Sequence, residues 1–285
     1  MFQRFFAVPL ILLSLVMGMI ICLPLTSAQA HLTISPLRVV FDGRTRSADI
    51  MLINTSPETN TYRMRWVYNV MDTYGSYKRA DVTLTPAFDV AEGVIFSPRQ
   101  VTLPPEGRQR VRLSLRRPAE LPDGEYRAHL VFQKLPNEND PALRQKQDNP
   151  PKRGQTLALN VLMGFSIPVI VRQGDYDADI SISKPEFVPG TTENGGKPQI
   201  KLTLSREGKH SSIGRVIVTW DKSKDPYKRI GVLNNVSVFP EIKERILNID
   251  LLEPNVSGGT VTVTYYGDGP QKGEILAEKT FQMGG

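Results

Sequence analysis

An alternating pattern between Leu157 and Ile167 constrains the fold more than any other feature of the chain. Every odd position in this stretch is apolar, and most of the even positions are small or polar. A period of two over this length predicts a long β-strand with one buried face. The preceding residues 137–155 are polar, charged and rich in proline, so they predict a loop with no core of its own. Such a strand would promote aggregation unless it is covered within the fold or kept for a partner.

The rest of the chain after residue 30 also has the pattern of strands. The predicted strands are short, proline and glycine clusters separate them, and no long stretch has a convincing helical period. This pattern predicts an all-β fold with two immunoglobulin-like β-sandwich domains in tandem. A hinge near 173–178 would give an N-terminal domain over 31–173 and a C-terminal domain over 174–285. The predicted strands include Arg38–Phe41, Ala48–Ile53, Tyr62–Val70, Gln109–Leu115, Tyr126–Lys134, Leu157–Val171, Gln199–Leu204, Gly214–Trp220, Leu247–Leu252 and Thr260–Tyr265.

Residues 1–30 predict a signal peptide. Arg4 supplies the positive start, an uncharged apolar run follows from Phe5 to Leu25, and Ala28-Gln29-Ala30 is a small-x-small cleavage site. We therefore expect a mature chain that begins at His31 and resides in the periplasm. An apolar run of about 20 residues is also long enough to span a bilayer, so an uncleaved anchor is the alternative.

The residues that usually carry enzymatic chemistry are few. The only cysteine, Cys22, lies in the predicted signal, so the mature chain of 255 residues (285 minus 30) has no disulfide and no thiol chemistry. None of the three histidines (His31, His129 and His210) has a second histidine or cysteine at metal-ligand spacing. The chain also lacks the common nucleophile, zinc and phosphate-loop motifs. We expect a protein that is not an enzyme and that holds no metal and no cofactor.

The charge balance is moderately basic, with a net charge of +6 for the whole chain and one unit less after the signal is removed. In the densest basic stretch, arginines alternate with uncharged residues up to Arg112. This alternation predicts that the arginines form the solvated outer face of a strand. A nucleic-acid surface is the alternative, but it fits poorly with export and with the lack of interleaved aromatic residues. We therefore expect no nucleic-acid partner. The densest basic stretch consists of Arg108, Arg110, Arg112, Arg116 and Arg117.

Several short segments are distinctive as a combination, although each is weak by itself. Arg38–Gly43 is the first of them. Ile95–Pro98 precedes Arg112 at a defined spacing, and Leu121-Pro122 is followed by Glu125. Three further segments complete the set: Pro136, Leu157–Arg172 and Tyr265–Gly269.

In combination these segments resemble the periplasmic pilus-assembly chaperones of the chaperone–usher family. The likeness is clearest over the first domain, where Leu157–Arg172 is similar to the family's donor strand and the segment after it. Only Tyr265–Gly269 is recognisable in the second domain. The resemblance implies a chaperone that binds pilus or fimbrial subunits by donor-strand complementation and delivers them to an outer-membrane usher.

The resemblance implies a donor strand over 157–171. Its odd-numbered side chains would fill the open core of a subunit, and burying one such side chain contributes about 1.5–3 kcal/mol before ordering costs. From the residues alone, the core of their own domain is the alternative location. Self-association through this strand is also open. The expected inserting positions are Leu159, Val161 and Met163, with Leu157 and Phe165 as extensions.

The resemblance also implies roles for four charged residues. Arg38 is similar to one of two basic residues that hold the C-terminal carboxylate of the subunit, a task that suits the forked guanidinium. Pro168 stands where the second basic residue is expected, and proline has neither charge nor backbone donor. Glu125, Arg172 and Asp268 match an ion network at the domain junction. The alternative is that all four are ordinary surface charges.

A structural or adhesive surface protein is the alternative function. Such a protein would have the same two β-sandwiches, would bind its partner through their faces and would lend no strand. The sequence does not identify the subunit, the usher or the type of fibre under either interpretation.

Overall fold

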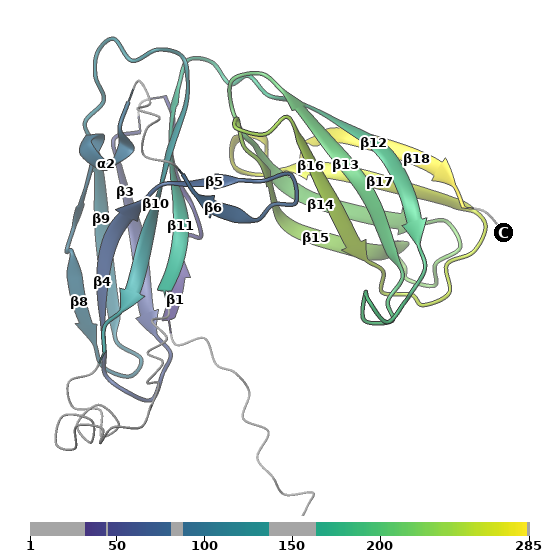
Figure 1. The fold of residues 1–285 in the computed structure, drawn as a ribbon, viewed down its shortest axis with the longest axis horizontal. Coiled ribbons are helices and arrows are strands. Elements are labelled where there is room, and N and C mark those ends of the chain that lie inside the picture. Colours follow the sequence, from purple (N-terminus) through teal and green to yellow (C-terminus); the bar gives the residue numbers. More distant parts are fainter. Residues whose placement is uncertain (1–31, 44, 81–87, 137–163, 284–285) are drawn as a thin grey trace, which may run out of the picture.

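The computed structural model describes residues 32–43, 45–80, 88–136 and 164–283. These residues form two β-sandwiches in tandem (Figure 1). The predicted fold class, all-β with two sandwich domains in tandem, is therefore confirmed. The predicted signal peptide lies outside the described residues. Within the described ranges, no helix has the length and apolar character needed to cross a membrane.

The first sandwich encloses one core between a four-stranded sheet and a five-stranded sheet. The four-stranded sheet has the order β1 (Leu32–Ser35), β3 (Ser47–Asn54), β9 (Arg108–Leu115) and β7 (Val94–Ser97). The five-stranded sheet has the order β2 (Val39–Phe41), β11 (Gly164–Gln173), β10 (Gly124–Lys134), β4 (Asn60–Val67) and β8 (Gln100–Leu103).

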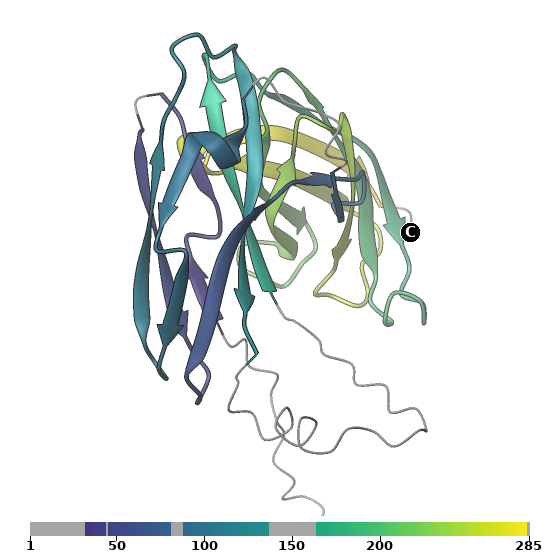
Figure 2. The ribbon, with the colours of Figure 1, turned by 60° about the vertical axis from the view of Figure 1, so that its left-hand side comes forward.

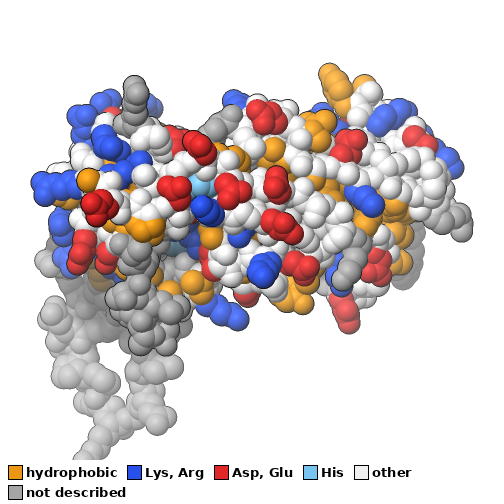
Figure 3. Space-filling view, turned by 90° about the horizontal axis from the view of Figure 1, so that it is seen from above, with side chains coloured by type: hydrophobic (Ala, Val, Ile, Leu, Met, Phe, Trp, Pro, Cys, Tyr) orange, Lys and Arg blue, Asp and Glu red, His pale blue; other side chains and the backbone are white. Residues whose placement is uncertain are grey.

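Alternation of side chains explains how the first core is filled. In β9 the side chains of Val111 and Leu113 are buried, whereas Arg108, Arg110 and Arg112 are exposed on the opposite side. The prediction that these arginines form the outer face of a strand is confirmed. On the face of the molecule seen in Figure 3, Lys and Arg side chains gather at the first-domain end.

The second sandwich is built in the same way from a three-stranded and a four-stranded sheet. The three-stranded sheet has the order β12 (Asp179–Val188), β13 (Gln199–Glu207) and β16 (Glu244–Asp250). The four-stranded sheet has the order β15 (Arg229–Val238), β14 (Ser212–Trp220), β17 (Thr260–Gly267) and β18 (Ile275–Gln282).

A separate two-stranded hairpin leaves the first sandwich and reaches the second, as the two views in Figures 1 and 2 agree. It consists of β5 (Asn69–Met71) and β6 (Tyr77–Arg79), and we call residues 69–79 the crossing hairpin. The sequence predicted one strand over Tyr62–Val70, but β4 ends at Val67 and the chain then turns out of the sheet. The described residues also include two short helical turns, α2 (Val90–Gly93) and η1 (Gly269–Gln271).

Candidate functional site: the open edge of β11 and the cleft between the domains

Strand β11 pairs with a neighbouring strand along the whole of one edge and along only part of the other edge. It pairs with β10 from Gly164 to Gln173. On its opposite edge, β2 pairs with Val169–Val171 only. Among the described residues, the edge of Gly164–Pro168 therefore has a strand partner on one side and none on the other.

The odd-numbered side chains of β11 from Phe165 to Val171 pack within their own domain, whereas Ile170 is buried in the hydrophobic cluster of the second sandwich. Ile167, Val169 and Val171 are buried in the first-domain core, and Phe165 packs against this core in a half-buried position. Phe165 also lies opposite Phe132 of β10. At Phe165, the structure thus shows packing against the first domain, which is the alternative that the sequence left open. The role of Phe165 as an extension into a subunit stays a prediction.

The other expected inserting residues cannot be placed. The predicted strand spanned 157–171, whereas the described strand begins at Gly164 and ends at Gln173. The expected donor positions Leu157, Leu159, Val161 and Met163 lie outside the described residues. Their assignment to the groove of a subunit therefore stays a prediction.

Arg38 lies at the junction of the two domains, directly before β2. Its Nη2 donates to Oδ2 of Asp268 at 2.9 Å and to Oδ1 of Asn235 at 3.0 Å, and both acceptors belong to the second domain. The other oxygen of Asp268 accepts from the backbone N–H of Gly269 at 2.9 Å, which fixes the carboxylate. Both described hydrogen bonds of Arg38 use Nη2, so Asp268 and Asn235 orient the guanidinium from one end.

The bulge in β15 explains how Asn235 reaches Arg38. The register of β15 with β14 shifts between Gly214 and Val216, and Asn235 has a backbone φ of 56°. Asparagine tolerates this left-handed conformation better than most residues, and a bulge re-aims the side chains that it carries. The local backbone of the second domain therefore turns an amide toward a cation of the first domain.

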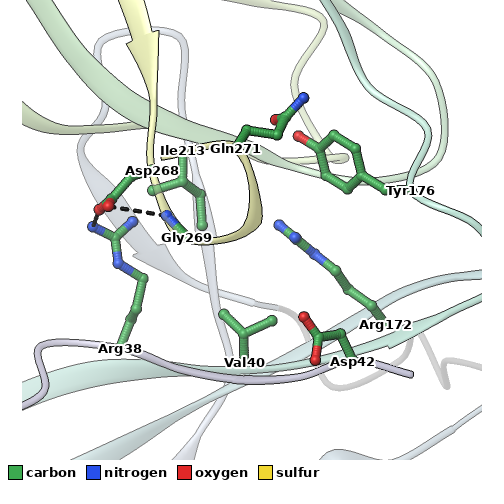
Figure 4. A pocket seen from close by; sticks show the side chains of 9 residues that line it. All are labelled: Arg38, Val40, Asp42, Arg172, Tyr176, Ile213, Asp268, Gly269 and Gln271. Atoms are coloured by element: carbon green, nitrogen blue, oxygen red, sulfur yellow. Dashed lines mark hydrogen bonds and ion pairs between the residues drawn. The ribbon is translucent and has the colours of Figure 1, made fainter. Parts of the chain in front are cut away.

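Two cavities flank Arg38. One has a volume of about 360 Å³, and Figure 4 shows it with Arg38 and Asp268 on one side and Arg172 and Tyr176 on the other. The second has a volume of about 250 Å³ and includes Pro168. Among the described residues that line this second cavity, Arg38 is the only charged one. The others are apolar, aromatic or small and polar, among them Leu37, Tyr77, Ser166, Ile167 and Phe239.

Pro168 brings no charge to the cleft, and its neighbour on β10 does not supply the missing charge. It pairs with His129 of β10, whose side chain is buried and whose two ring nitrogens have no hydrogen-bond partner among the described residues. Burial and the nearby Arg127 cation lower the pKa of His129 to about 4. His129 is therefore neutral at ordinary pH, and it supplies no second cation beside Arg38.

Glu125 and Arg172 meet in a buried ion pair close to the linker between the domains. The Arg172 Nε donates to Oε2 of Glu125 at 3.1 Å, and the Glu125 side chain is fully buried. The same oxygen accepts from the backbone N–H of Ser211 at 2.9 Å and from its hydroxyl at 2.7 Å. Arg172 Nη2 also donates to the Ser211 carbonyl at 3.0 Å, so this cluster links the two domains.

The predicted network of three charges is therefore only partly assembled, and this corrects one assignment. Glu125 and Arg172 come together, but the described ion pair of Asp268 is with Arg38. The physical reason is position: Asp268 follows β17 on the Arg38 side of the cavity, across from Arg172 (Figure 4). Ser211, which the sequence analysis did not identify, takes the place of Asp268 as the second-domain partner of the pair.

The crossing hairpin is the largest feature of the cleft that the sequence analysis missed. Its residue Tyr77 lines the cavity beside Arg38, and the Tyr77 ring packs edge-on against His129 with centroids 5.0 Å apart. The turn residues Asp72 and Gly75 are compatible with a hairpin. No local signal indicates that this hairpin would contact another domain.

Metal chemistry finds no support in the described part of the chain. No group of three or more His, Cys, Asp or Glu side chains lies close enough together there to hold an ion. The arrangement instead combines the open edge of β11 with a cleft that Arg38 lines.

Comparisons with known proteins bring weak similarities only. No family model matches the chain, and no curated protein matches it in sequence. Among solved structures, the chain is similar to the YadV chaperone, with 12% identity and a TM-score of 0.43 over 89% of this chain and 100% of that one. It is also similar to the complex of SafA pilin with the SafB chaperone from Salmonella enterica (13%, TM-score 0.42, over 90% and 98% of the two chains).

A third similar structure is the CsuC–CsuE chaperone–tip adhesion subunit pre-assembly complex from the archaic chaperone–usher Csu pili of Acinetobacter baumannii. The identity is 12% and the TM-score 0.42, over 89% of this chain and 98% of that one. Proteins of this kind are also those that the sequence motifs resemble. Because the similarities are weak both in sequence and in superposition, the functional argument rests on the site itself.

Proposed function

We propose that the chain is a periplasmic chaperone without catalytic activity, which captures pilus or fimbrial subunits and passes them to an outer-membrane usher. The observation that carries this proposal is the open edge of β11 at Gly164–Pro168, beside the cleft that holds Arg38. An extended segment of a partner could add to this edge through backbone hydrogen bonds. The motif resemblance supports a pilus-type subunit as that partner.

The proposed donor residues precede the described part of β11. Leu157, Leu159, Val161 and Met163 share the odd positions of one alternating pattern with Phe165. On a continuous strand they would all point to the same face. In our proposal the odd residues from Ile167 onward anchor the strand in its own domain, while those before Phe165 fill the groove of the subunit.

Arg38 is proposed to hold a carboxylate of the captured subunit. Its side chain is only 20% exposed, and bonds from Nη2 to Asp268 and Asn235 hold it in place. A guanidinium oriented in this way needs little further ordering to accept a ligand. With Pro168 in the position of the second cation, the anchor relies on one charged group.

The alternative, a surface β-sandwich protein that lends no strand, has one observation in its favour. The odd residues of β11 from Phe165 to Val171 all pack with the first-domain core. If Leu157–Met163 did the same, no strand would be left to lend. The decisive test must therefore address the residues before Gly164.

We expect the double substitution Val161→Asp and Met163→Asp to abolish subunit capture, because charged side chains cannot enter an apolar groove. The matched control is Ala158→Asp with Asn160→Asp, which adds the same charge to the even positions. The measurement is periplasmic co-expression with each secreted, pilus-type subunit of the source genome, followed by co-purification. A correctly folded double variant that retains its subunit as well as the control does would refute the proposal.

A further inference from the structure

The crossing hairpin places a side chain of the first domain inside the core of the second. Met71 is 5% exposed and belongs to the hydrophobic cluster of the second sandwich. Its backbone N–H donates to Oε1 of Glu241 at 2.9 Å. The contact therefore combines apolar burial with a charge-assisted hydrogen bond, and the donor and acceptor of this bond belong to different domains.

The turn of the hairpin continues the contact at the edge of a second-domain sheet. The Thr73 carbonyl accepts from the backbone N–H of Ile246 at 2.7 Å. Ile246 lies in β16, the edge strand whose other side pairs with β13. Gly75, with a φ of 82°, lies under the guanidinium of Arg245, and a Cβ at this position would come within 2.5 Å of Arg245 Nη2. The hairpin thus fits closely against the second domain.

Arg127 secures the base of the hairpin. Its side chain is 8% exposed, forms an ion pair with Glu241 and donates to the Asn69 carbonyl at 3.2 Å. Its guanidinium also lies 3.5 Å from the centroid of the Phe239 ring. A single carboxylate, Glu241, therefore receives both the hairpin backbone and a cation of the first domain.

We propose that the crossing hairpin is a positioning element that fixes the angle between the domains and so keeps the cleft at Arg38 in its binding shape. The covalent link and the Glu125–Arg172–Ser211 cluster lie together near one end of the interface and act as a single pivot. The hairpin contacts the second domain away from this pivot, and two separated contacts prevent rotation. Its residue Tyr77 also lines the cleft.

The test uses Met71→Asp, because a charged side chain cannot stay in the apolar core and the hairpin must undock. Spin labels at Ser114→Cys in β9 and Lys279→Cys in β18 report the distance between the domains, and both positions are exposed. The sequence has no cysteine after Cys22, so in a chain expressed without the predicted signal the labelling is specific. We expect a narrow distance distribution for the parent chain and a broad one for Met71→Asp, while both domains keep their thermal transitions.

The matched control is Tyr74→Asp, which adds the same charge to the same hairpin at a side chain that is 68% exposed. This control and the conservative variant Met71→Leu should both retain the narrow distribution. An unchanged narrow distribution in Met71→Asp would overturn the proposal.

The consequence for binding rests on the proposed function. We expect Met71→Asp to weaken co-purification of the subunit at least tenfold, although Met71 itself does not line the cleft. Unchanged capture despite a broad distribution would overturn the role of the hairpin in binding. If the parent chain captures no subunit at all, the proposed function fails, while the distance measurement still decides whether the hairpin fixes the domain angle.

Discussion

Two of the contacts that join the domains differ in the interaction that dominates them. Near the linker, Glu125 and Arg172 form a buried ion pair whose remaining bonds go to Ser211. At the crossing hairpin, Met71 enters an apolar core and the backbone of Thr73 pairs with a strand edge. The first contact depends on charges that must be matched, whereas the second depends mainly on burial and backbone pairing.

This difference predicts how each contact fails. A buried charge that loses its partner carries a desolvation cost that nothing offsets. Replacing one member of the ion pair should therefore lower the stability strongly, whereas replacing both members should lower it only weakly. The hairpin can undock into water at a cost set mainly by the surface it exposes. The linker contact should therefore govern the stability of the chain, and the hairpin should govern the angle between the domains.

The largest effect is expected from Arg172→Met, which leaves the fully buried carboxylate of Glu125 unpaired. Breaking a buried pair in this way typically costs about 3–5 kcal/mol. The double variant Arg172→Met with Glu125→Leu should recover much of this loss, because it removes both charges. Urea unfolding of the single and double variants measures the difference. Additive losses would contradict the assignment of a coupled buried pair.

A smaller effect is expected from pH through His129, which packs against Tyr77 of the crossing hairpin. Burial, with the Arg127 cation, lowers the pKa of His129 in the folded chain to about 4, whereas the unfolded chain keeps the ordinary value of 6.5. The unfolded state therefore binds a proton first, and stability should fall as pH decreases from about 6.5 to about 4. Since one pKa unit corresponds to about 1.4 kcal/mol, the total loss would be about 3 kcal/mol.

The measurement is the free energy of unfolding between pH 4 and 7 for the parent chain and for His129→Leu. The difference between the two curves isolates the contribution of this histidine. We expect the curves to diverge as the pH falls. Parallel curves would show that His129 does not carry this pH dependence.

The smallest effect on stability is expected at Arg38, which pairs with Asp268 at the opening of the cleft. The Asp268 side chain is 48% exposed, and a solvated pair contributes about 0–1 kcal/mol. Arg38→Ala should therefore leave urea unfolding nearly unchanged and yet strongly weaken subunit capture. A large loss of stability would place Arg38 with the structural contacts instead, and undiminished capture would remove its role as the carboxylate anchor.

Much of the fold could be predicted from local patterns. The alternation in Gln109–Leu115 predicted a strand with arginines on its outer face, and β9 has this form. Proline and glycine clusters predicted short strands and two sandwiches, because these residues interrupt regular structure wherever they occur. For the candidate site, the motifs drew attention to Arg38, Glu125 and Arg172, all three of which lie at the domain junction.

The pairing of these residues was not predictable from the sequence. Asp268 was expected beside Arg172 but pairs with Arg38, and Ser211 bonds to the Glu125–Arg172 pair. A charge in a sequence shows that a partner is needed, but the choice of partner depends on which loops the two domains bring together. In this chain that choice follows from the angle between the sandwiches and from the bulge that turns Asn235 toward Arg38.

The sequence by itself therefore determined which residues form strands and which faces of those strands avoid water, because both follow from spacing along the chain. Only the tertiary structure determined which part of the molecule covers each apolar face. Met71 is apolar in any context, but its burial in the core of the other domain follows from the path of a hairpin that leaves its own sheet. Hydrophobicity favours the burial of an apolar side chain but does not select the residues that bury it. The packing of the two sandwiches makes that selection.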